Sequence, residues 1–286
     1  MEFLTMALLG LVQGLTEFLP VSSSGHLVLA AAVFGAPSLG VLEVVVLHLG
    51  TLVGMVHYFR HDLLQLAGFR PAGLEPIGPR ERARRLLLLG VATVVTVGIA
   101  LVVEPLLGLA FESLWVVGIG LIVTATALLT TVRLARRAEG ASFEALGFRG
   151  AVFIGLAQAA ALCPGISRSG ITISAGLVVG LRQSEAARFS FLMAFPVIAG
   201  AVVRELAPLL VDGGAVEVAG EAAGSGGAAA TTSIGALLVG GLVAAVSGWL
   251  ALRFLFGLFR RTTLGGFAYY CLVAAVLAFG LAMVRG

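Results

Sequence analysis

The sequence predicts an all-α polytopic integral membrane protein with six transmembrane helices and two re-entrant helix pairs. Of its 286 residues, 59% are hydrophobic and only 12% are charged, and the mean hydropathy is +1.08. Long apolar stretches alternate with short loops that contain arginine, and polar residues interrupt two of the apolar segments. No class of soluble protein has this composition. The net charge of +3 does not indicate nucleic-acid binding, because the arginines sit in the short loops.

Residues 1–41 form the first interrupted segment. Its polar break reads QGLTEFLPVSSSGH and runs from Gln13 to His26. Each apolar arm is shorter than the roughly 20 residues that a membrane-spanning helix requires. Pro20 removes a backbone donor and disfavours continuation of a helix. Because irregular backbone is tolerated at membrane depth only where it is buried in protein or lines a cavity, we expect a re-entrant pair of short helices here.

Three full-length apolar stretches follow, at 42–59, 86–103 and 114–132. The loops between them, at 60–85 and 133–149, hold arginines, so the positive-inside rule places both loops in the cytoplasm. The turn at Glu104 and Pro105 is then exterior. The arginines are Arg60, Arg70, Arg80, Arg82, Arg84 and Arg85 in the first loop, and Arg133, Arg136 and Arg137 in the second.

The second interrupted segment is 150–181, and arginines flank both of its ends, so it is also expected to re-enter. Spans at 188–210, with a kink at Pro196, at 233–256 and at 264–284 complete the chain. The Gly/Ala-rich stretch 211–231 has no arginine and is predicted to be a flexible exterior loop. Arg260 and Arg261 mark a cytoplasmic turn, so six spans bring both termini to the exterior side. The early sequence has no positive region, which argues against a cleaved signal peptide.

The polar break occurs twice, at a spacing of 145 residues. The second copy reads GLAQAAALCPGISRSGITIS, and its proline, Pro164, is displaced by one position. Each half has one re-entrant pair and three spans. Because the number of spans per half is odd, the second half is inverted in the membrane relative to the first. We therefore expect a single membrane domain, 1–286, made of two inverted repeats at about 1–132 and 147–286. The shift places Gly10, Leu11, Gln13, Ser22, Ser24 and Gly25 on Gly155, Leu156, Gln158, Ser167, Ser169 and Gly170.

The two copies differ in charge. Glu17 falls on Leu162 and Ser23 falls on Arg168, so one half supplies a carboxylate and the other a cation. A carboxylate in hydrocarbon costs roughly 2.5–3.5 kcal/mol on insertion scales, so Glu17 is expected to face protein or a water-filled cavity. Unwound backbone, several hydroxyl groups and a helix that starts near Gly25 are typical of an anion site.

Each polar group in the break has a functional and a structural interpretation. Arg168 either clamps phosphate through a bidentate guanidinium or serves only as the counter-ion of Glu17. Glu17 is a general base or a cation ligand, or no more than that counter-ion. His26 is an acid–base group or a hydrogen-bonded interior histidine. Serines at a break of this kind also serve as helix caps.

The remaining reactive residues carry no recognisable motif. The sequence has no CxxC, no HExxH and no P-loop. Cys163 and Cys271 lie in apolar surroundings and are expected to be core thiols. His48, His57 and His61 have no partner pattern along the chain.

The segments TEFLPVSSSGH and PGISRSGIT resemble the motifs of the undecaprenyl-pyrophosphate phosphatase family, also called bacitracin-resistance proteins. The resemblance covers essentially the whole chain. It implies that Glu17, Ser23, His26 and Arg168 are catalytic, with Ser23 as nucleophile or, alternatively, as a phosphate ligand while water attacks directly. It further implies phosphate binding by Gln13, Ser22, Ser24, Ser167, Ser169 and Thr172. Gln13 occupies a position where many members have Glu, so hydrogen bonding is its expected role.

The activity implied by the resemblance is hydrolysis of a polyprenyl diphosphate to the monophosphate and inorganic phosphate. This reaction recycles the lipid carrier of cell-envelope polymers such as peptidoglycan. The resemblance also implies help from a divalent cation, Mg²⁺ or Ca²⁺, with Glu17 as its ligand, and a site open to the exterior face of the cell membrane. A homodimer is a further expectation, beside contacts with membrane lipids.

Two other functions compete with the phosphatase. Inverted repeats and broken helices are traits of transporters, so a flippase or transporter of the polyprenyl phosphate carrier is the alternative. A purely structural membrane subunit is the third, and the charges at the breaks argue against it because a charge in hydrocarbon without a task is costly.

Overall fold

The computed structural model describes residues 2–34, 40–70, 73, 75–103, 110, 113–135, 140–211, 232–259 and 263–285. Within these ranges the regular structure is helical, apart from one isolated bridge between Ala141 and Leu181. The helices are α1 (Glu2–Phe18), α2 (Ser23–Phe34), α3 (Val41–Tyr58), α4 (Arg60–Leu66), α5 (Pro79–Val103), α6 (Leu114–Ala135), the 3-10 turn η3 (Phe143–Ala145), α7 (Phe148–Ala160), α8 (Arg168–Val178), α9 (Gln183–Val211), α10 (Ile234–Leu258) and α11 (Gly265–Arg285).

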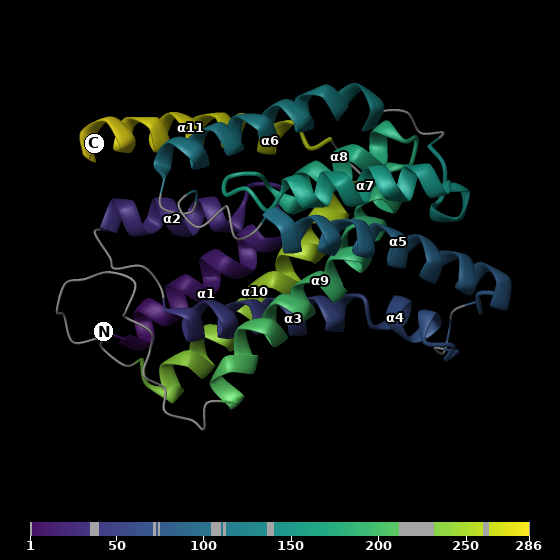
Figure 1. Ribbon diagram of the computed structural model, residues 1–286, viewed down its shortest axis with the longest axis horizontal. Coiled ribbons are helices and arrows are strands. Elements are labelled where there is room, and N and C mark those ends of the chain that lie inside the picture. Colours follow the sequence, from purple (N-terminus) through teal and green to yellow (C-terminus); the bar gives the residue numbers. More distant parts are fainter. Residues whose placement is uncertain are drawn as a thin grey trace.

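Six of the described helices are long and apolar enough to cross a membrane, as the sequence predicts. These are α3, α5, α6, α9, α10 and α11. Figure 1 shows both ends of the chain at one end of the bundle, whereas α4 and the start of α5 lie at the opposite end. The predicted all-helical polytopic membrane fold is therefore confirmed.

The two interrupted segments fold into helix pairs, as expected. Helix α1 contacts α2, and α7 contacts α8. Helices α2, α7 and α8 have 12, 13 and 11 residues, which corresponds to roughly 16–20 Å at 1.5 Å per residue. These helices are too short to cross a bilayer core of about 30 Å on their own.

The prediction of a polar loop at 60–85 is wrong in part, because this range contains α4 and the first residues of α5. Leu63 and Leu66 of α4 pack against the core, which stabilises this short helix. Helix α5 begins at Pro79, where a proline fits the first helical turn because its missing N–H would have no partner there. Helix α9 likewise starts earlier than expected, at Gln183, and continues through Pro196.

Some predictions fall on residues outside the described ranges. These are the exterior loop at 212–231, the turn at Glu104 and Pro105, and the arginines Arg136, Arg137, Arg260 and Arg261.

Helix α10 packs between α1 and α3 at very short range. A Cβ atom added at Gly10 of α1 would lie 2.3 Å from the carbonyl oxygen of Gly240, and one added at Gly54 of α3 would lie 2.4 Å from that of Ala245. Small residues allow this close approach of helix backbones, which is how helices associate in membranes without a hydrophobic driving force. The packing fixes α1, and with it the first polar break.

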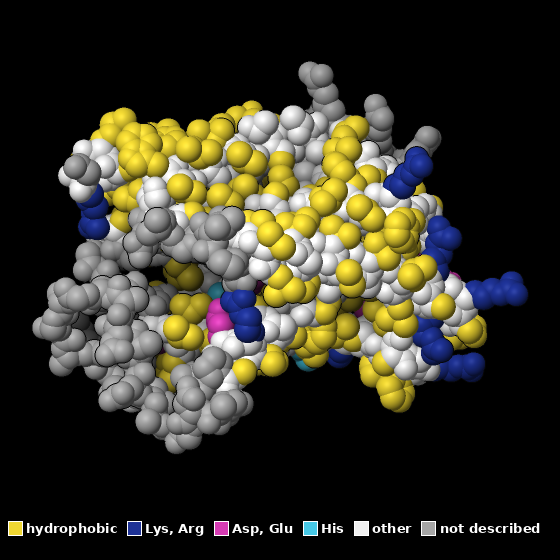
Figure 2. All heavy atoms as spheres, in the orientation of Figure 1, with side chains coloured by type: hydrophobic (Ala, Val, Ile, Leu, Met, Phe, Trp, Pro, Cys, Tyr) yellow, Lys and Arg dark blue, Asp and Glu magenta, His cyan; other side chains and the backbone are white. Residues whose placement is uncertain are grey.

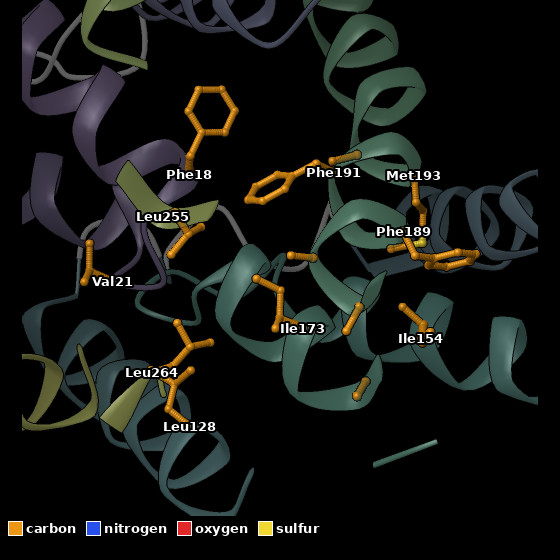
Figure 3. Packing of buried hydrophobic residues seen from close by; sticks show 14 of the residues in the cluster. Phe18, Val21, Leu128, Ile154, Ile173, Phe189, Phe191, Met193, Leu255 and Leu264 are labelled. Carbon is orange, nitrogen blue, oxygen red and sulfur yellow. The ribbon is translucent and has the colours of Figure 1, made fainter. Parts of the chain in front are cut away.

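Buried apolar side chains pack around the end of the first helix pair. Phe18, the last residue of α1, is fully buried, and its ring meets that of Phe191 of α9 edge-on with centroids 5.8 Å apart. Figure 3 shows these two rings facing each other, with Ile173 of α8 and Leu255 of α10 nearby. Because Phe18 directly follows Glu17, the buried ring fixes the position of the preceding carboxylate.

The surface has an apolar belt and one arginine-rich end. Figure 2 shows hydrophobic side chains over the middle of the molecule and basic side chains gathered at the end that carries α4 and the start of α5. Arg85 of α5 pairs with Glu81 at 2.7 Å and with Glu144 of η3, and Arg188 of α9 pairs with Asp62 of α4. This distribution is the one that the positive-inside rule predicts for the cytoplasmic end.

A contact between two helices recurs between their counterparts in the other half of the chain. Helix α1 packs on α10, and their counterparts α7 and α5 pack on each other. Helix α6 packs on its own counterpart, α11, along one side of the bundle (Figure 1). The division at 1–132 and 147–286 and the inverted direction of the halves in a membrane stay predictions.

Candidate active site

The two polar breaks form turns that share one capping hydrogen bond. The hydroxyl of Ser22 accepts a hydrogen bond from the N–H of Gly25 at 3.3 Å, and the hydroxyl of Ser167 accepts one from Gly170 at 3.2 Å. Serine is a favoured N-cap because its oxygen satisfies an N–H group that has no partner inside the helix. The 145-residue repeat thus corresponds to a repeated cap, at the starts of α2 and α8.

Each turn reverses the chain through one residue in the left-handed region. These residues are Ser22, with φ +72°, and Gly165, with φ +87°. Glycine adopts such angles freely, whereas serine does so rarely. Backbone strain of this kind persists where the surrounding structure enforces it, and it is frequent at functional sites.

The two turns contact each other directly. The hydroxyl of Ser169 donates to the carbonyl oxygen of Leu19 at 3.2 Å, which links the second turn to the first. A Cβ atom added at Gly25 would lie 3.2 Å from the Cα of Gly165. The starts of α2 and α8 are therefore adjacent, and their combined dipoles favour negative charge between them.

Glu17 lies where the two turns meet and is only 8% exposed. Its Oε2 accepts hydrogen bonds from the hydroxyl of Ser23 at 2.8 Å and from Nε2 of Gln13 at 3.1 Å. Its Oε1 accepts one from Nη2 of Arg168 at 2.5 Å. The carboxylate of the first half and the cation of the second, which the sequence predicts to meet, form one buried ion pair. Ser23 and Arg168 are the first residues of α2 and α8.

Arg168 uses only half of its guanidinium for this pair. Its Nη1 atom is buried and has no hydrogen-bond partner among the residues that the structure describes. A buried donor without a partner costs free energy, and an arginine presents two parallel N–H groups that match a phosphate. The free Nη1 is thus a donor available to an anionic ligand.

A cavity of about 170 Å³ opens beside the ion pair. Its polar lining comes from Glu17, Arg168, His48 of α3, Gln158 of α7 and Glu205 of α9. The rest of its wall is an aliphatic stripe on α9, formed by Ala194, Val197, Ile198, Ala201 and Val202. A charged head group and an apolar chain could therefore occupy the same cavity.

Comparisons with known proteins match the chain over nearly its full length. The family described as bacitracin resistance protein BacA matches residues 6–277. The chain belongs to the bacitracin resistance protein BacA family. A relative from Rubrobacter xylanophilus, named undecaprenyl-diphosphatase, is 43% identical over 99% of this chain and 100% of its own length. Relatives of the same name from Syntrophotalea carbinolica, at 40% identity, and Alcanivorax borkumensis, at 35%, cover 98% and 99% of this chain and 99% and 100% of their own lengths.

Membership of the BacA family confirms the resemblance, and the structure shows where the expected site residues lie. Gln13, Glu17, Ser23 and Arg168 form one hydrogen-bonded group. Of these four residues, Glu17 and Arg168 line the cavity. Their roles in catalysis stay predictions, to which the geometry adds contacts and distances.

Other expected phosphate ligands are engaged with protein groups. Ser22 and Ser167 are caps, and Ser24 lies 3.4 Å from the hydroxyl of Ser22. Thr172 is fully buried, donates to the carbonyl oxygen of Arg168 at 2.7 Å and lies 2.5 Å from the hydroxyl of Ser190 on α9. The structure thus gives these hydroxyls structural contacts.

His26, expected to be catalytic, has both ring nitrogens in hydrogen bonds outside the cavity lining. Its Nδ1 lies 2.7 Å from the carbonyl oxygen of Ser22, and its Nε2 lies 2.7 Å from the hydroxyl of Tyr270 on α11. The His26 and Tyr270 rings stack with centroids 5.5 Å apart. This is the geometry of the interior histidine that the sequence left open as the alternative.

Sequence reasoning missed three residues that line the cavity. Gln158 is the repeat counterpart of Gln13, so the 145-residue shift could have identified it. His48 and Glu205 carry no such signal, because both lie on apolar helices outside the two polar breaks. They reach the cavity only through the packing of α3 and α9 around the turns.

Proposed function

We propose that the chain is a membrane-embedded phosphatase that hydrolyses a polyprenyl diphosphate of the undecaprenyl type to the monophosphate and inorganic phosphate. Its relatives are named undecaprenyl-diphosphatase over essentially their full length. The observation that carries the proposal is the contact between Ser23, Glu17 and Arg168, with Nη1 of Arg168 free to bind. This group combines a nucleophile, a base and a phosphate clamp.

The terminal phosphate would bind between Arg168 and the starts of α2 and α8. There the guanidinium and the free N–H groups of two helix ends balance the charge of the diphosphate. The polar contacts on this side come from donors, which suits phosphate oxygens.

The first chemical step uses the contact between Ser23 and Glu17. As Oγ of Ser23 bonds to the terminal phosphorus, its proton passes to Oε2 of Glu17, which lies 2.8 Å away. The bridging P–O bond breaks, and its electron pair leaves with the polyprenyl monophosphate. Arg168 stabilises the charge that develops on the transferred phosphoryl group.

The isoprenoid tail would lie along the aliphatic stripe of α9. The stripe begins at Ala194, 11 residues after the first residue of α9, which is roughly 16 Å from the arginine-rich end. The stripe ends at Val202, 19 residues after the first residue of this 29-residue helix, so the cavity lies around the middle of the bundle. With the arginine-rich end in the cytoplasm, we expect the site to open toward the exterior face of the cell membrane, because the carrier lipid is recycled outside the cell.

We propose separately that a divalent cation takes part by arriving with the substrate. The described residues contain no group of three His, Cys, Asp or Glu side chains placed to hold a metal ion. Both oxygens of Glu17 already accept hydrogen bonds, and the Arg168 charge beside Oε1 repels a cation. The residues as arranged do not fit a resident cation, so the steps above use protein groups alone. Loss of activity on adding a chelator, and its return with Mg²⁺ or Ca²⁺, would support a cation that arrives with the substrate.

The alternative of a flippase or transporter has no specific observation in its favour, and the names of the relatives do not support it. A homodimer stays a prediction. The test of the proposed function is phosphate release from polyprenyl diphosphate by the purified full-length protein in detergent, with no membrane gradient. Absence of release at any divalent-cation concentration would refute the proposal.

A further inference from the structure

Two residues of the cavity lining, His48 and Gln158, present hydrogen-bond acceptors. Nδ1 of His48 lies 2.8 Å from the carbonyl oxygen of Val44. A carbonyl can only accept, so in the neutral ring Nδ1 carries the hydrogen and Nε2 carries the lone pair. The amide oxygen of Gln158 is buried and accepts no hydrogen bond from the described part of the chain.

The Nε2 atom of His48 faces Oε2 of Glu17 across a gap of 4.0 Å. This is too long for a direct hydrogen bond, but one water molecule spans such a gap with two hydrogen bonds of about 2.8 Å. In the second step Oε2 of Glu17 carries the proton taken from Ser23, so Nε2 of His48 offers the lone pair in this gap that accepts an O–H bond of water. The gap is therefore suited to water, whereas Nη1 of Arg168 is suited to phosphate.

Proton transfer in the proposed reaction requires a second acceptor. In the first step Glu17 takes the proton of Ser23. In the second step water bonds to phosphorus, the P–Oγ bond breaks, and Glu17 returns its proton to Oγ of Ser23. The proton that the water loses then has to go elsewhere, and of the ring nitrogens and carboxylates in the cavity lining, Nε2 of His48 lies next to this carboxylate.

We propose that His48 binds the hydrolytic water and takes its proton in the second step. The inference rests on the proposed function, since it assigns a residue to the second half of the same reaction. Once the polyprenyl monophosphate has left along α9, the cavity admits water to the side of the phosphoseryl group that the leaving group vacated. From Nε2 the proton passes to the inorganic phosphate as it departs.

Single-turnover assays on the purified full-length protein test this assignment. The substrate is polyprenyl diphosphate labelled at its terminal phosphorus, and acid-quenched samples are analysed for lipid monophosphate, label on Ser23 and inorganic phosphate. For His48→Leu we expect formation of lipid monophosphate within about threefold of wild type. We expect release of inorganic phosphate to fall about 100-fold, the usual scale of general base catalysis, so that label accumulates on Ser23.

His48→Gln separates orientation of the water from proton transfer. Its amide oxygen can accept a hydrogen bond from water but cannot take the proton, so its rate of phosphate release should lie between those of His48→Leu and wild type. His57→Leu, which changes another histidine of α3 whose ring lies beside Trp249, is the matched control and should behave as wild type.

Two outcomes overturn the inference while leaving the proposed function intact. One is phosphate release by His48→Leu or His48→Gln within threefold of wild type. The other is a parallel loss of lipid monophosphate and inorganic phosphate, with no label retained on Ser23. If the wild-type protein itself releases no phosphate, the proposed function fails first, and the two failures are thereby distinguished.

Discussion

Replacement of Arg168 by lysine is the sharpest test of the phosphate clamp. In the structure Nη2 of Arg168 holds Glu17 at 2.5 Å, while Nη1 is buried without a partner. A lysine ammonium keeps the positive charge but is a single point of contact on a flexible stem. It can neutralise Glu17 or bind the substrate phosphate, whereas arginine can do both at once.

The expected loss of kcat follows from the loss of one hydrogen-bond donor to the substrate phosphate. Removal of one preorganised donor at a developing charge typically costs 10²–10³ in kcat, or about 2.7–4 kcal/mol. Arg168→Lys should therefore lower kcat at least 100-fold. Its stability should change little, because Glu17 keeps a cationic neighbour. Arg168→Gln leaves the buried carboxylate without a counter-ion and should destabilise the fold by about 3–5 kcal/mol as well.

The assay is phosphate release at saturating polyprenyl diphosphate, with the midpoint of thermal unfolding in detergent measured in parallel. Arg188→Lys is the matched control, since Arg188 pairs with Asp62 at the arginine-rich end and lies outside the cavity lining. It should retain wild-type activity. If Arg168→Lys stayed within threefold of wild type with its unfolding midpoint unchanged, the argument that both guanidinium nitrogens are needed would be refuted.

Three further predictions test the geometry around the site. Gly165→Ala should destabilise the fold by about 1–3 kcal/mol, because the residue has φ +87° and an added Cβ would lie 2.2 Å from a carbonyl oxygen of α6; an unchanged unfolding midpoint would contradict this. Thr172→Val should lower stability by about 1 kcal/mol through its lost contact with Ser190, while kcat/KM stays within threefold; a loss of 100-fold would instead show that the hydroxyl serves the substrate. Although partial burial alone would raise the pKa of Glu144, hydrogen bonds and the charge of Arg85 hold that pKa below 4.5. The ionised Glu144 therefore contributes its full stability above pH 4.5, and this contribution is lost as pH falls through the lowered pKa. In Glu144→Gln this contribution is absent, so the unfolding midpoint should fall less steeply on the acid side when it is plotted against pH.

The hydropathy pattern and the repeat predicted much of this architecture, because they depend on local sequence. A polar break with a proline inside an apolar segment too short to span has few solutions in a bilayer. The opposite charges at the two breaks predicted that Glu17 and Arg168 would meet, since an unpaired charge in hydrocarbon is costly. Gln158 could have been added on the same grounds, as the repeat counterpart of Gln13.

The rest of the site depends on packing that no local pattern encodes. His48 lies on an apolar helix, and only the position of α3 beside the first turn brings it to Glu17. Thr172 and Ser167 match a motif, yet their hydroxyls contact α9 and their own turn. A motif specifies which residues are near the site, but hydrogen-bond geometry determines which of them face the ligand.

The ion pair between the two turns has a consequence for biosynthesis. Glu17 emerges from the ribosome 151 residues before its counter-ion, Arg168. Until the later half is synthesised, the nascent chain has to carry this carboxylate near the bilayer either protonated or at the water interface. Completion of the ion pair is thus a late event of membrane insertion, and a chain truncated before α8 would hold a helix pair that lacks the Arg168 counter-ion.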